Sequence, residues 1–106
     1  MIQGDIYWVK LKEPDKTRPA LIITRNSAIA LLTSITVIPI TTTLRDHPAN
    51  VWLDESDGML EPCVINVDQI RTISKDKFDT YITHLTSSKL DEVFEAIKFA
   101  FGFNDK

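Results

Sequence analysis

Short segments rich in β-branched and apolar residues, separated by turn residues, fill most of this 106-residue chain. Residues 4–12 alternate along the chain, with Tyr7, Val9 and Leu11 on one face, and predict a strand of period two. Further strands are predicted over residues 18–24, 35–42, 50–53, 61–67 and 70–73. Strands this short and this close together favour a small, strongly bent antiparallel sheet or open barrel.

Two helices are predicted. Asn26 and Ser27 are expected to cap a short helix through residue 33, because nothing in that segment breaks a helix. A longer helix is expected to start after a cap at residues 86–88 and to stop near Gly102. Five apolar residues at helical spacing form its predicted buried stripe: Leu90, Val93, Phe94, Ile97 and Phe101. This helix is expected to close one side of the sheet.

Proline and glycine mark the breaks between these elements. Pro39 has no N–H for a strand ladder, so the strand over residues 35–42 is expected to be bulged or at an edge. Residues 12–16 are compatible with a hairpin turn. Residues 54–58 form a predicted solvated turn, in which Gly58 supplies unusual dihedral angles and the acidic residues do not bind a metal.

The length predicts a single domain over residues 1–106. The net charge of −3 differs from that of a general nucleic-acid coat, which is basic. Residues 1–53 carry six basic and four acidic side chains, a net +2, whereas residues 54–106 carry six and eleven, a net −5. A local positive site on an acidic body suits contact with a few phosphates.

No apolar stretch approaches membrane-spanning length, and the first residues lack the pattern of a secretion signal, so the cytoplasm is the expected location. Cys63 is the only cysteine, which excludes an internal disulfide. No cofactor is expected.

Several motifs occur in a characteristic order. They are Gly4-Asp5-Ile6-Tyr7-Trp8-Val9, Thr17-Arg18-Pro19, Val37-Ile38-Pro39-Ile40-Thr41, Asp68-Gln69-Ile70-Arg71-Thr72-Ile73 and Ile82-Thr83-His84-Leu85. In this order the chain resembles the MazF/PemK (Kid-like) family of toxin endoribonucleases from bacterial toxin–antitoxin pairs, over nearly its whole length. The resemblance implies a compact SH3-like antiparallel β-barrel with a C-terminal helix. It also implies sequence-specific, metal-independent cleavage of single-stranded RNA to 2′,3′-cyclic phosphate and 5′-OH ends.

Arg18 is the first candidate for catalysis. RNA supplies its own nucleophile, the 2′-OH, so the protein must stabilise charge on the phosphoryl oxygens and handle two protons. A guanidinium is always charged and pairs with two phosphate oxygens. The resemblance makes Arg18 the essential arginine and Thr41 the active-site hydroxyl. The ordinary alternatives are a solvated strand-end arginine and a strand threonine. The nuclease hypothesis requires Arg18 to border a groove, free of any ion pair elsewhere.

The remaining site residues follow from the same resemblance. Asp68 is expected to accept a proton or to orient Arg71, although a turn aspartate bonded to its own backbone is an equal alternative. Gln69 is expected to read a base edge, and Trp8 to stack on a base or to contact a protein partner. Asn66 and Arg71 are also expected to bind the RNA. Asn66 stands where some members of the family carry an arginine, and the loop at residues 12–17 is short, which leaves the general base open. The other titratable or aromatic candidates are interpreted as structural or surface residues: His47, His84 and Trp52.

The resemblance implies three partners: single-stranded RNA, a second copy in a homodimer, and a cognate antitoxin whose flexible acidic tail folds on binding. One alternative is a CcdB-like gyrase poison, which acts through its last helix and C-terminal residues without nuclease chemistry. Phe101-Gly102-Phe103 faintly resembles the end of such a protein. Another alternative is a small docking module without catalysis.

Overall fold

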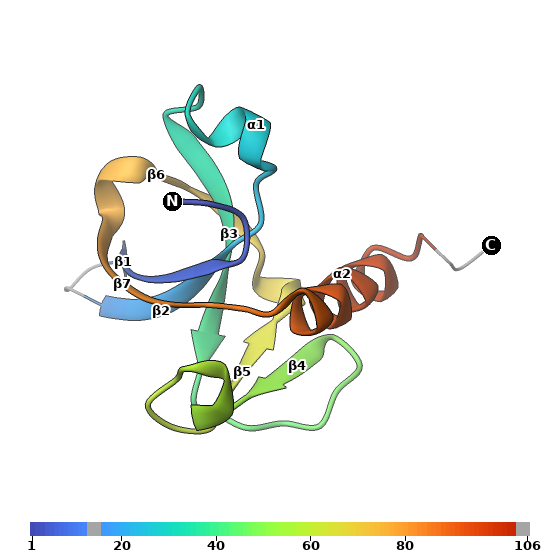
Figure 1. The fold of residues 1–106 in the computed structure, drawn as a ribbon. Coiled ribbons are helices and arrows are strands. Elements are labelled where there is room, and N and C mark those ends of the chain that lie inside the picture. Colours follow the sequence, from blue (N-terminus) through green and yellow to red (C-terminus); the bar gives the residue numbers. More distant parts are fainter. Residues whose placement is uncertain (13–15, 104–106) are drawn as a thin grey trace.

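The computed structural model describes residues 1–12 and 16–103, and Figure 1 shows their arrangement. Seven strands pair in one antiparallel sheet. Six of them follow the order β4-β5-β3-β2-β1-β7, and β6 pairs with β3 outside this strand order. The strands are β1 (Asp5–Lys12), β2 (Lys16–Ile22), β3 (Ser34–Thr41), β4 (Asn50–Leu53), β5 (Cys63–Asn66), β6 (Arg71–Ser74) and β7 (Phe78–His84). The helices are α1 (Asn26–Ile29) and α2 (Ser87–Ala100), with 3-10 turns η1 (Glu55–Asp57), η2 (Val67–Gln69) and η3 (Lys75–Lys77).

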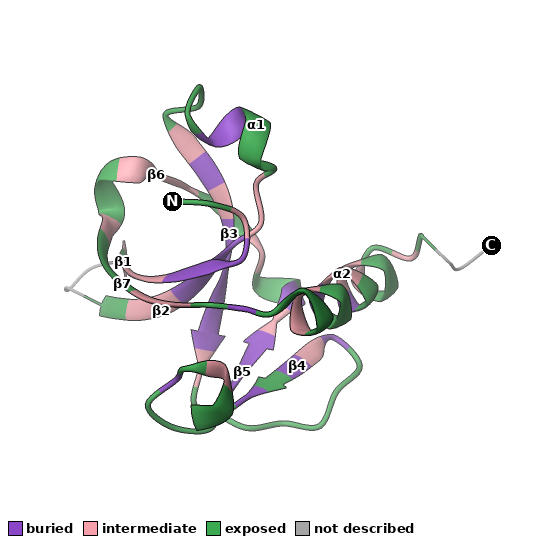
Figure 2. Ribbon diagram, viewed as in Figure 1, coloured by how far each residue is buried: buried purple, intermediate pink, exposed green. Residues whose placement is uncertain are grey.

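Buried side chains form two clusters. Figure 2 shows buried residues, in purple, along β1, β2, β3 and β5. Ile6 belongs to the cluster under α2, whereas Val9 belongs to the second cluster, which includes Phe78 of β7. Neighbouring faces of β1 therefore pack in different clusters, as its alternating sequence predicts. The prediction of a mainly β fold with a bent antiparallel sheet and a C-terminal helix is confirmed, although β4 and β7 end the sheet and do not close it.

Strand β3 lies inside the sheet, so the prediction of an edge strand at Pro39 is wrong. On one side Pro39 is in register with Ala20 of β2. On the other side β3 pairs with β6 as far as Val37 and with β5 from Ile40 onward. Pro39 therefore lies where the neighbouring strand changes, and it has no registered partner on that side. Proline has no N–H to donate, so it fits at a break in the hydrogen-bond ladder just as it fits on an edge strand.

Helix α2 matches its prediction at both ends. The Thr86 hydroxyl accepts a hydrogen bond from the Lys89 N–H at 3.2 Å, and Gly102 adopts a φ of 70° just after the helix. Of the predicted buried stripe, only Val93 is buried, while Leu90, Phe94 and Ile97 are half-buried and Phe101 is 54% exposed because the helix ends beyond the sheet. Ala96 is buried in the same helix instead. Among the described residues no helix has the length and apolarity needed to cross a membrane.

The short helix is the least accurate prediction. Helix α1 ends at Ile29 and Arg25 is its N-cap, so neither Asn26 nor Ser27 caps it. The Asn26 side chain instead accepts a hydrogen bond from the Gln3 N–H at 2.7 Å, which fastens the helix to the chain start. The sequence interpretation also missed β7, which places His84 in a strand and not in a connector. The β1–β2 hairpin is present, but its predicted turn includes residues 13–15, which lie outside the described residues.

Candidate active site

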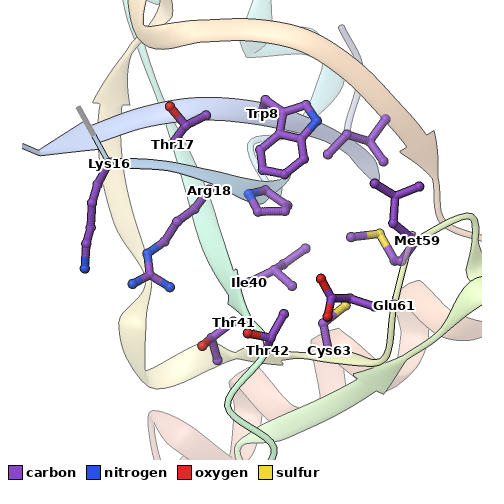
Figure 3. A pocket seen from close by; sticks show the side chains of 13 residues that line it. Trp8, Lys16, Thr17, Arg18, Ile40, Thr41, Thr42, Met59, Glu61 and Cys63 are labelled. Atoms are coloured by element: carbon purple, nitrogen blue, oxygen red, sulfur yellow. The ribbon is translucent and has the colours of Figure 1, made fainter.

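Two cavities lie side by side on the sheet and share Arg18, Ile40 and Thr41 in their walls. The first, here called the apolar cavity, has a volume of about 300 Å³ and is drawn in Figure 3. Its other walls include Trp8, Pro19, Met59, Glu61 and Cys63. The second, here called the polar cavity, has a volume of about 390 Å³. Its other walls include Arg45, Asn50, Asn66, Gln69 and Arg71.

Arg18 reaches this shared rim from the middle of β2. Its backbone is in register with Val9 of β1, a fully buried residue, so the arginine stands on a rigid part of the sheet. The side chain is half-buried and borders both cavities. Within the described residues Arg18 has no carboxylate within 4.0 Å, as the nuclease hypothesis requires. A guanidinium in this position is available for an anionic ligand.

Thr41 is the last residue of β3, in register with Val64 of β5. Its hydroxyl oxygen accepts a hydrogen bond from the Thr43 N–H at 3.1 Å. Because a hydroxyl has one hydrogen to donate, this contact leaves the donor free for a ligand in either cavity. Three consecutive threonines follow Ile40, and Thr41 is the one that lines both cavities.

The polar cavity collects three arginines from separate parts of the chain. Arg18 comes from β2, Arg71 from the start of β6 and Arg45 from the segment after β3. The Asn50 side-chain N–H donates to the Arg45 carbonyl oxygen at 2.8 Å and so holds that segment beside β4. No carboxylate is among the described residues that line this cavity. Its electrostatic potential is therefore positive although the chain is acidic overall.

The turn η2 presents an amide to the polar cavity. The Asn66 side-chain oxygen accepts a hydrogen bond from the Asp68 N–H at 3.0 Å, which caps this turn. Gln69 follows in the same turn and lines the polar cavity. Asp68 is exposed and lines neither cavity, so its role as an acid, base or orienting group stays a prediction.

The apolar cavity contains a thiol that stays protonated at neutral pH. Cys63 begins β5 and is 3% exposed. Burial, followed by the charges of Glu61, Asp57 and Asp54, raises its pKa to about 11. Because the thiolate is the nucleophilic form, Cys63 acts here as a small apolar wall residue.

Residues 54–62, here called the wall loop, supply Met59, Leu60 and Glu61 to the apolar cavity. Asp54 begins the loop and accepts hydrogen bonds from the Ser56 hydroxyl and N–H at 2.6 and 2.8 Å. These contacts lower the pKa of Asp54. They show that Asp54 caps its own turn, in agreement with the prediction of a turn at residues 54–58. Residues 1–12 and 16–103 contain no cluster of three potential metal ligands.

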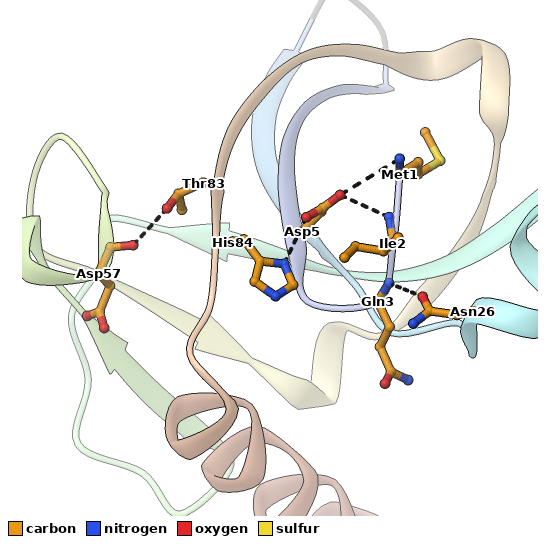
Figure 4. Close-up of polar contacts among 8 residues, drawn as sticks. All are labelled: Met1, Ile2, Gln3, Asp5, Asn26, Asp57, Thr83 and His84. Carbon is orange, nitrogen blue, oxygen red and sulfur yellow. Dashed lines mark hydrogen bonds and ion pairs between the residues drawn. The ribbon is translucent and has the colours of Figure 1, made fainter.

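A contact with β7 fixes the wall loop on the body of the protein. The Thr83 hydroxyl donates to the Asp57 carbonyl oxygen at 3.1 Å, as Figure 4 shows. Gly58 follows with a φ of 94°, and a side chain at this position would collide with Thr83. Both the dihedral angle and the close approach therefore require glycine.

The two histidines have structural contacts outside the cavities, as the sequence interpretation predicts. His84 Nδ1 lies 2.9 Å from Asp5 Oδ1, and Asp5 Oδ2 accepts a hydrogen bond from the Ile2 N–H at 2.9 Å (Figure 4). His47 Nδ1 accepts a hydrogen bond from the Ala49 N–H at 3.0 Å. Trp52 is 45% exposed on β4 and lines neither cavity.

Six of the seven predicted site residues therefore line the two cavities: Arg18, Thr41, Trp8, Asn66, Gln69 and Arg71. Sequence reasoning missed Arg45 and Glu61. Arg45 was part of the basic excess of the first half of the chain, which was a usable signal. Glu61 had no signal, because it was assigned to a strand that in fact begins at Cys63.

The sequence profile of the PemK-like, MazF-like toxins of type II toxin–antitoxin systems matches residues 2–101. The chain belongs to this family. It is 37% identical over 96 residues to the endoribonuclease MazF3 of Mycobacterium tuberculosis, covering 91% of this chain and 93% of that protein. The solved M. tuberculosis toxin MazF-mt6 superposes with a TM-score of 0.84 at 37% identity, over 92% of this chain and 95% of that one.

A second solved structure, a mycobacterial endoribonuclease in complex with its cognate antitoxin, has a TM-score of 0.85 at 24% identity. It covers 96% of this chain and 95% of that one, and at this identity it supports the fold alone.

Proposed function

We propose that this toxin-family member is an endoribonuclease that cleaves single-stranded RNA at a short sequence. The observation that carries the proposal is the position of Arg18 and Thr41 on the rim shared by two cavities. The 37% identity to an endoribonuclease supports the same activity. The cytoplasm, where RNA is translated, is the expected place of action.

In the proposed reaction the ribose 2′-OH attacks the adjacent phosphorus. A bond from the 2′-oxygen to phosphorus forms and the bond to the 5′-oxygen breaks, leaving a 2′,3′-cyclic phosphate and a 5′-OH. The 2′-OH loses a proton and the departing 5′-oxygen gains one. Arg18 pairs with the phosphoryl oxygens as charge grows on them, and the Thr41 hydroxyl donates to one of them. A donor positioned in this way lowers the activation barrier by about 3 kcal/mol.

The two cavities let an RNA strand continue on both sides of the scissile phosphate. Arg45 and Arg71 are placed to neutralise neighbouring phosphates in the polar cavity, and Gln69 to contact a base edge there. Trp8 offers an aromatic face in the other cavity. Asp68 remains a candidate for the proton acceptor or for orienting Arg71.

An antitoxin and a second copy of the chain complete the proposal. The cationic polar cavity suits a flexible acidic segment, which would cover the residues that RNA needs. The mycobacterial endoribonuclease of the same fold was solved in complex with its cognate antitoxin. The homodimer remains an expectation from the family. The gyrase-poison alternative receives no support, because the matching profile is that of the PemK-like, MazF-like toxins.

The test is cleavage of a long, unstructured RNA in the presence of EDTA. Discrete fragments with 5′-OH and cyclic phosphate ends are expected, whereas intact RNA or 5′-phosphate ends would contradict the proposal. Arg18→Ala should reduce cleavage at least a hundredfold. Arg25→Ala is the matched control, because Arg25 is exposed and lines neither cavity. Equal losses in both variants would remove Arg18 from the mechanism.

A further inference from the structure

We propose that the apolar cavity is a base-binding subsite in which the Glu61 carboxylate accepts a hydrogen bond from the exocyclic amino group of a nucleobase. The inference rests on the proposed function, because it places this base on the nucleotide next to the scissile phosphate at Arg18. The subsite would select cytosine, adenine or guanine over uracil, which has no amino group.

The shape and composition of the apolar cavity fit one base. Its volume of about 300 Å³ lies at the lower end of the range for small-molecule sites. Trp8 and Met59 border it, and Ile40 forms part of its floor, so a flat apolar ring would replace water against apolar side chains. Such a surface binds the faces of all bases and cannot distinguish them. Discrimination needs a polar group at the edge.

Glu61 is the one carboxylate among the described residues that line either cavity. Figure 3 shows it across the apolar cavity from Arg18 and Lys16. A nucleotide bound through its phosphate at Arg18 would extend its base across this space toward Glu61.

The Glu61 carboxylate is also free to act. Among the described residues it forms no ion pair, whereas Asp54 and Asp57 of the same wall loop bind the loop's own N–H groups. The neighbouring Cys63 is a protonated thiol and adds no second anion to the wall. An acceptor-only group pairs with amino groups of bases, as acidic residues do with cytosine. Uracil offers only its N3–H, which lies between two carbonyl oxygens that the carboxylate repels, so it pairs with Glu61 less favourably than an amino group does.

The experiment compares the wild-type protein with Glu61→Gln on RNAs that differ only at the two nucleotides flanking the cut. At one of these positions the wild type should prefer amino-bearing bases over uracil by roughly tenfold to a hundredfold in kcat/KM, as expected for a hydrogen bond to a charged group. Glu61→Gln should reduce this ratio to a few-fold and improve cleavage next to uracil. Glu55→Gln, an exposed carboxylate of the same loop outside both cavities, should behave as the wild type.

Two results would overturn the proposal. An unchanged base preference in Glu61→Gln would show that this carboxylate does not read a base. An equal loss of kcat for all four bases, with an altered pH–rate profile, would instead assign Glu61 to proton transfer. Thermal unfolding of each variant checks that the fold is retained, and Glu61→Ala should abolish the preference in the same way.

A binding measurement separates this inference from the nuclease proposal. Oligonucleotides with a 2′-deoxyribose at the cut position lack the nucleophile and can be titrated against tryptophan fluorescence. If the protein cuts no RNA but binds amino-bearing oligonucleotides more tightly, and Glu61→Gln removes the difference, the subsite stands and the nuclease proposal fails. If the oligonucleotides bind without base preference, or do not bind, the subsite proposal is wrong.

Discussion

The polar and apolar cavities share a rim but differ in how their far walls are built. The far wall of the polar cavity comes mostly from regular structure, with Asn66 from β5, Gln69 from η2 and Arg71 from β6, whereas Arg45 comes from the segment after β3. The apolar cavity owes Met59 and Glu61 to the wall loop. The far wall of the polar cavity thus carries positive charge, whereas the far wall of the apolar cavity carries apolar side chains on a turn. Under the proposed function, this difference would let charge hold the RNA backbone on one side of the cut and let apolar contact hold a base on the other side.

The largest expected difference concerns Cys63, which reports whether the apolar cavity is shielded. A thiol with a pKa of about 11, compared with the ordinary 9.0, is ionised about a hundredfold less at pH 8. Alkylation by iodoacetamide should therefore be at least a hundredfold slower in the folded protein than in urea. Equal rates in the folded protein and in urea would show that the apolar cavity does not shield Cys63 from solvent.

The same shift predicts how stability depends on pH. Between about 9 and 11 the unfolded chain loses the Cys63 proton while the folded protein keeps it, so the free energy of unfolding decreases as pH rises. Cys63→Ala should remove this part of the decrease. Chemical unfolding of both proteins at pH 8 and pH 10.5 measures it, and parallel losses in both would contradict the assignment.

Trp8→Ala tests the base-binding side. Loss of one stacked base typically weakens binding by about 1–3 kcal/mol, or roughly fivefold to a hundredfold. The dependence of binding on salt should stay unchanged, because no phosphate contact is lost. Trp52→Ala is the control, since Trp52 lines neither cavity. A reduced salt dependence in Trp8→Ala would mean that the two cavities are not specialised as described.

Gly58→Ala should disturb the apolar cavity alone. An alanine would have to keep a φ of 94° and would collide with Thr83, so the free energy of unfolding should decrease by about 1–3 kcal/mol. The base preference should weaken while the salt dependence of binding stays the same. Gly102→Ala imposes a similar backbone penalty at the end of α2, outside both cavities, and should leave the base preference intact.

Arg71→Ala tests the polar cavity with the smallest expected effect. Binding of an uncleavable RNA should weaken several-fold at low salt. The slope of log affinity against log salt should become shallower by about 0.7, the value for one phosphate contact of a single strand. Arg45→Ala should act in the same way. Lys98→Ala is the control, because Lys98 pairs with Glu95 on α2 at 3.1 Å. An unchanged slope in the arginine variants would contradict a backbone-binding role.

The sequence allowed the fold to be predicted where local pattern and tertiary packing agree. The alternation in residues 4–12 and the spacing in α2 reflect burial directly, so both elements were predicted. Strand β7 was missed because its outward residues are polar and its inward ones only half-buried, which leaves a weak pattern. Pro39 was misplaced because a change of neighbouring strand cannot be seen along the chain.

The residues of the candidate site were likewise predictable only where a local sequence motif marked them. Arg18 and Thr41 were found through their motifs, and the structure brings them together because β2 and β3 are neighbours in the sheet. Arg45 and Glu61 come from irregular segments, whose position depends on tertiary contacts such as the hydrogen bond from Asn50 to the Arg45 carbonyl. Residue type alone could not distinguish Glu61 from the other carboxylates of the wall loop.

The shared rim has an evolutionary consequence. If Arg18 and Thr41, which border both cavities, cut RNA as proposed, the choice of target and the act of cutting rest on different residues. The wall loop is held on the scaffold by Met59, which packs in the core cluster, and by the bond from Thr83, whereas its cap lies within the loop itself. New recognition sequences could thus arise through loop replacement while the cutting centre remained as it is, and the same division offers a route to deliberate retargeting.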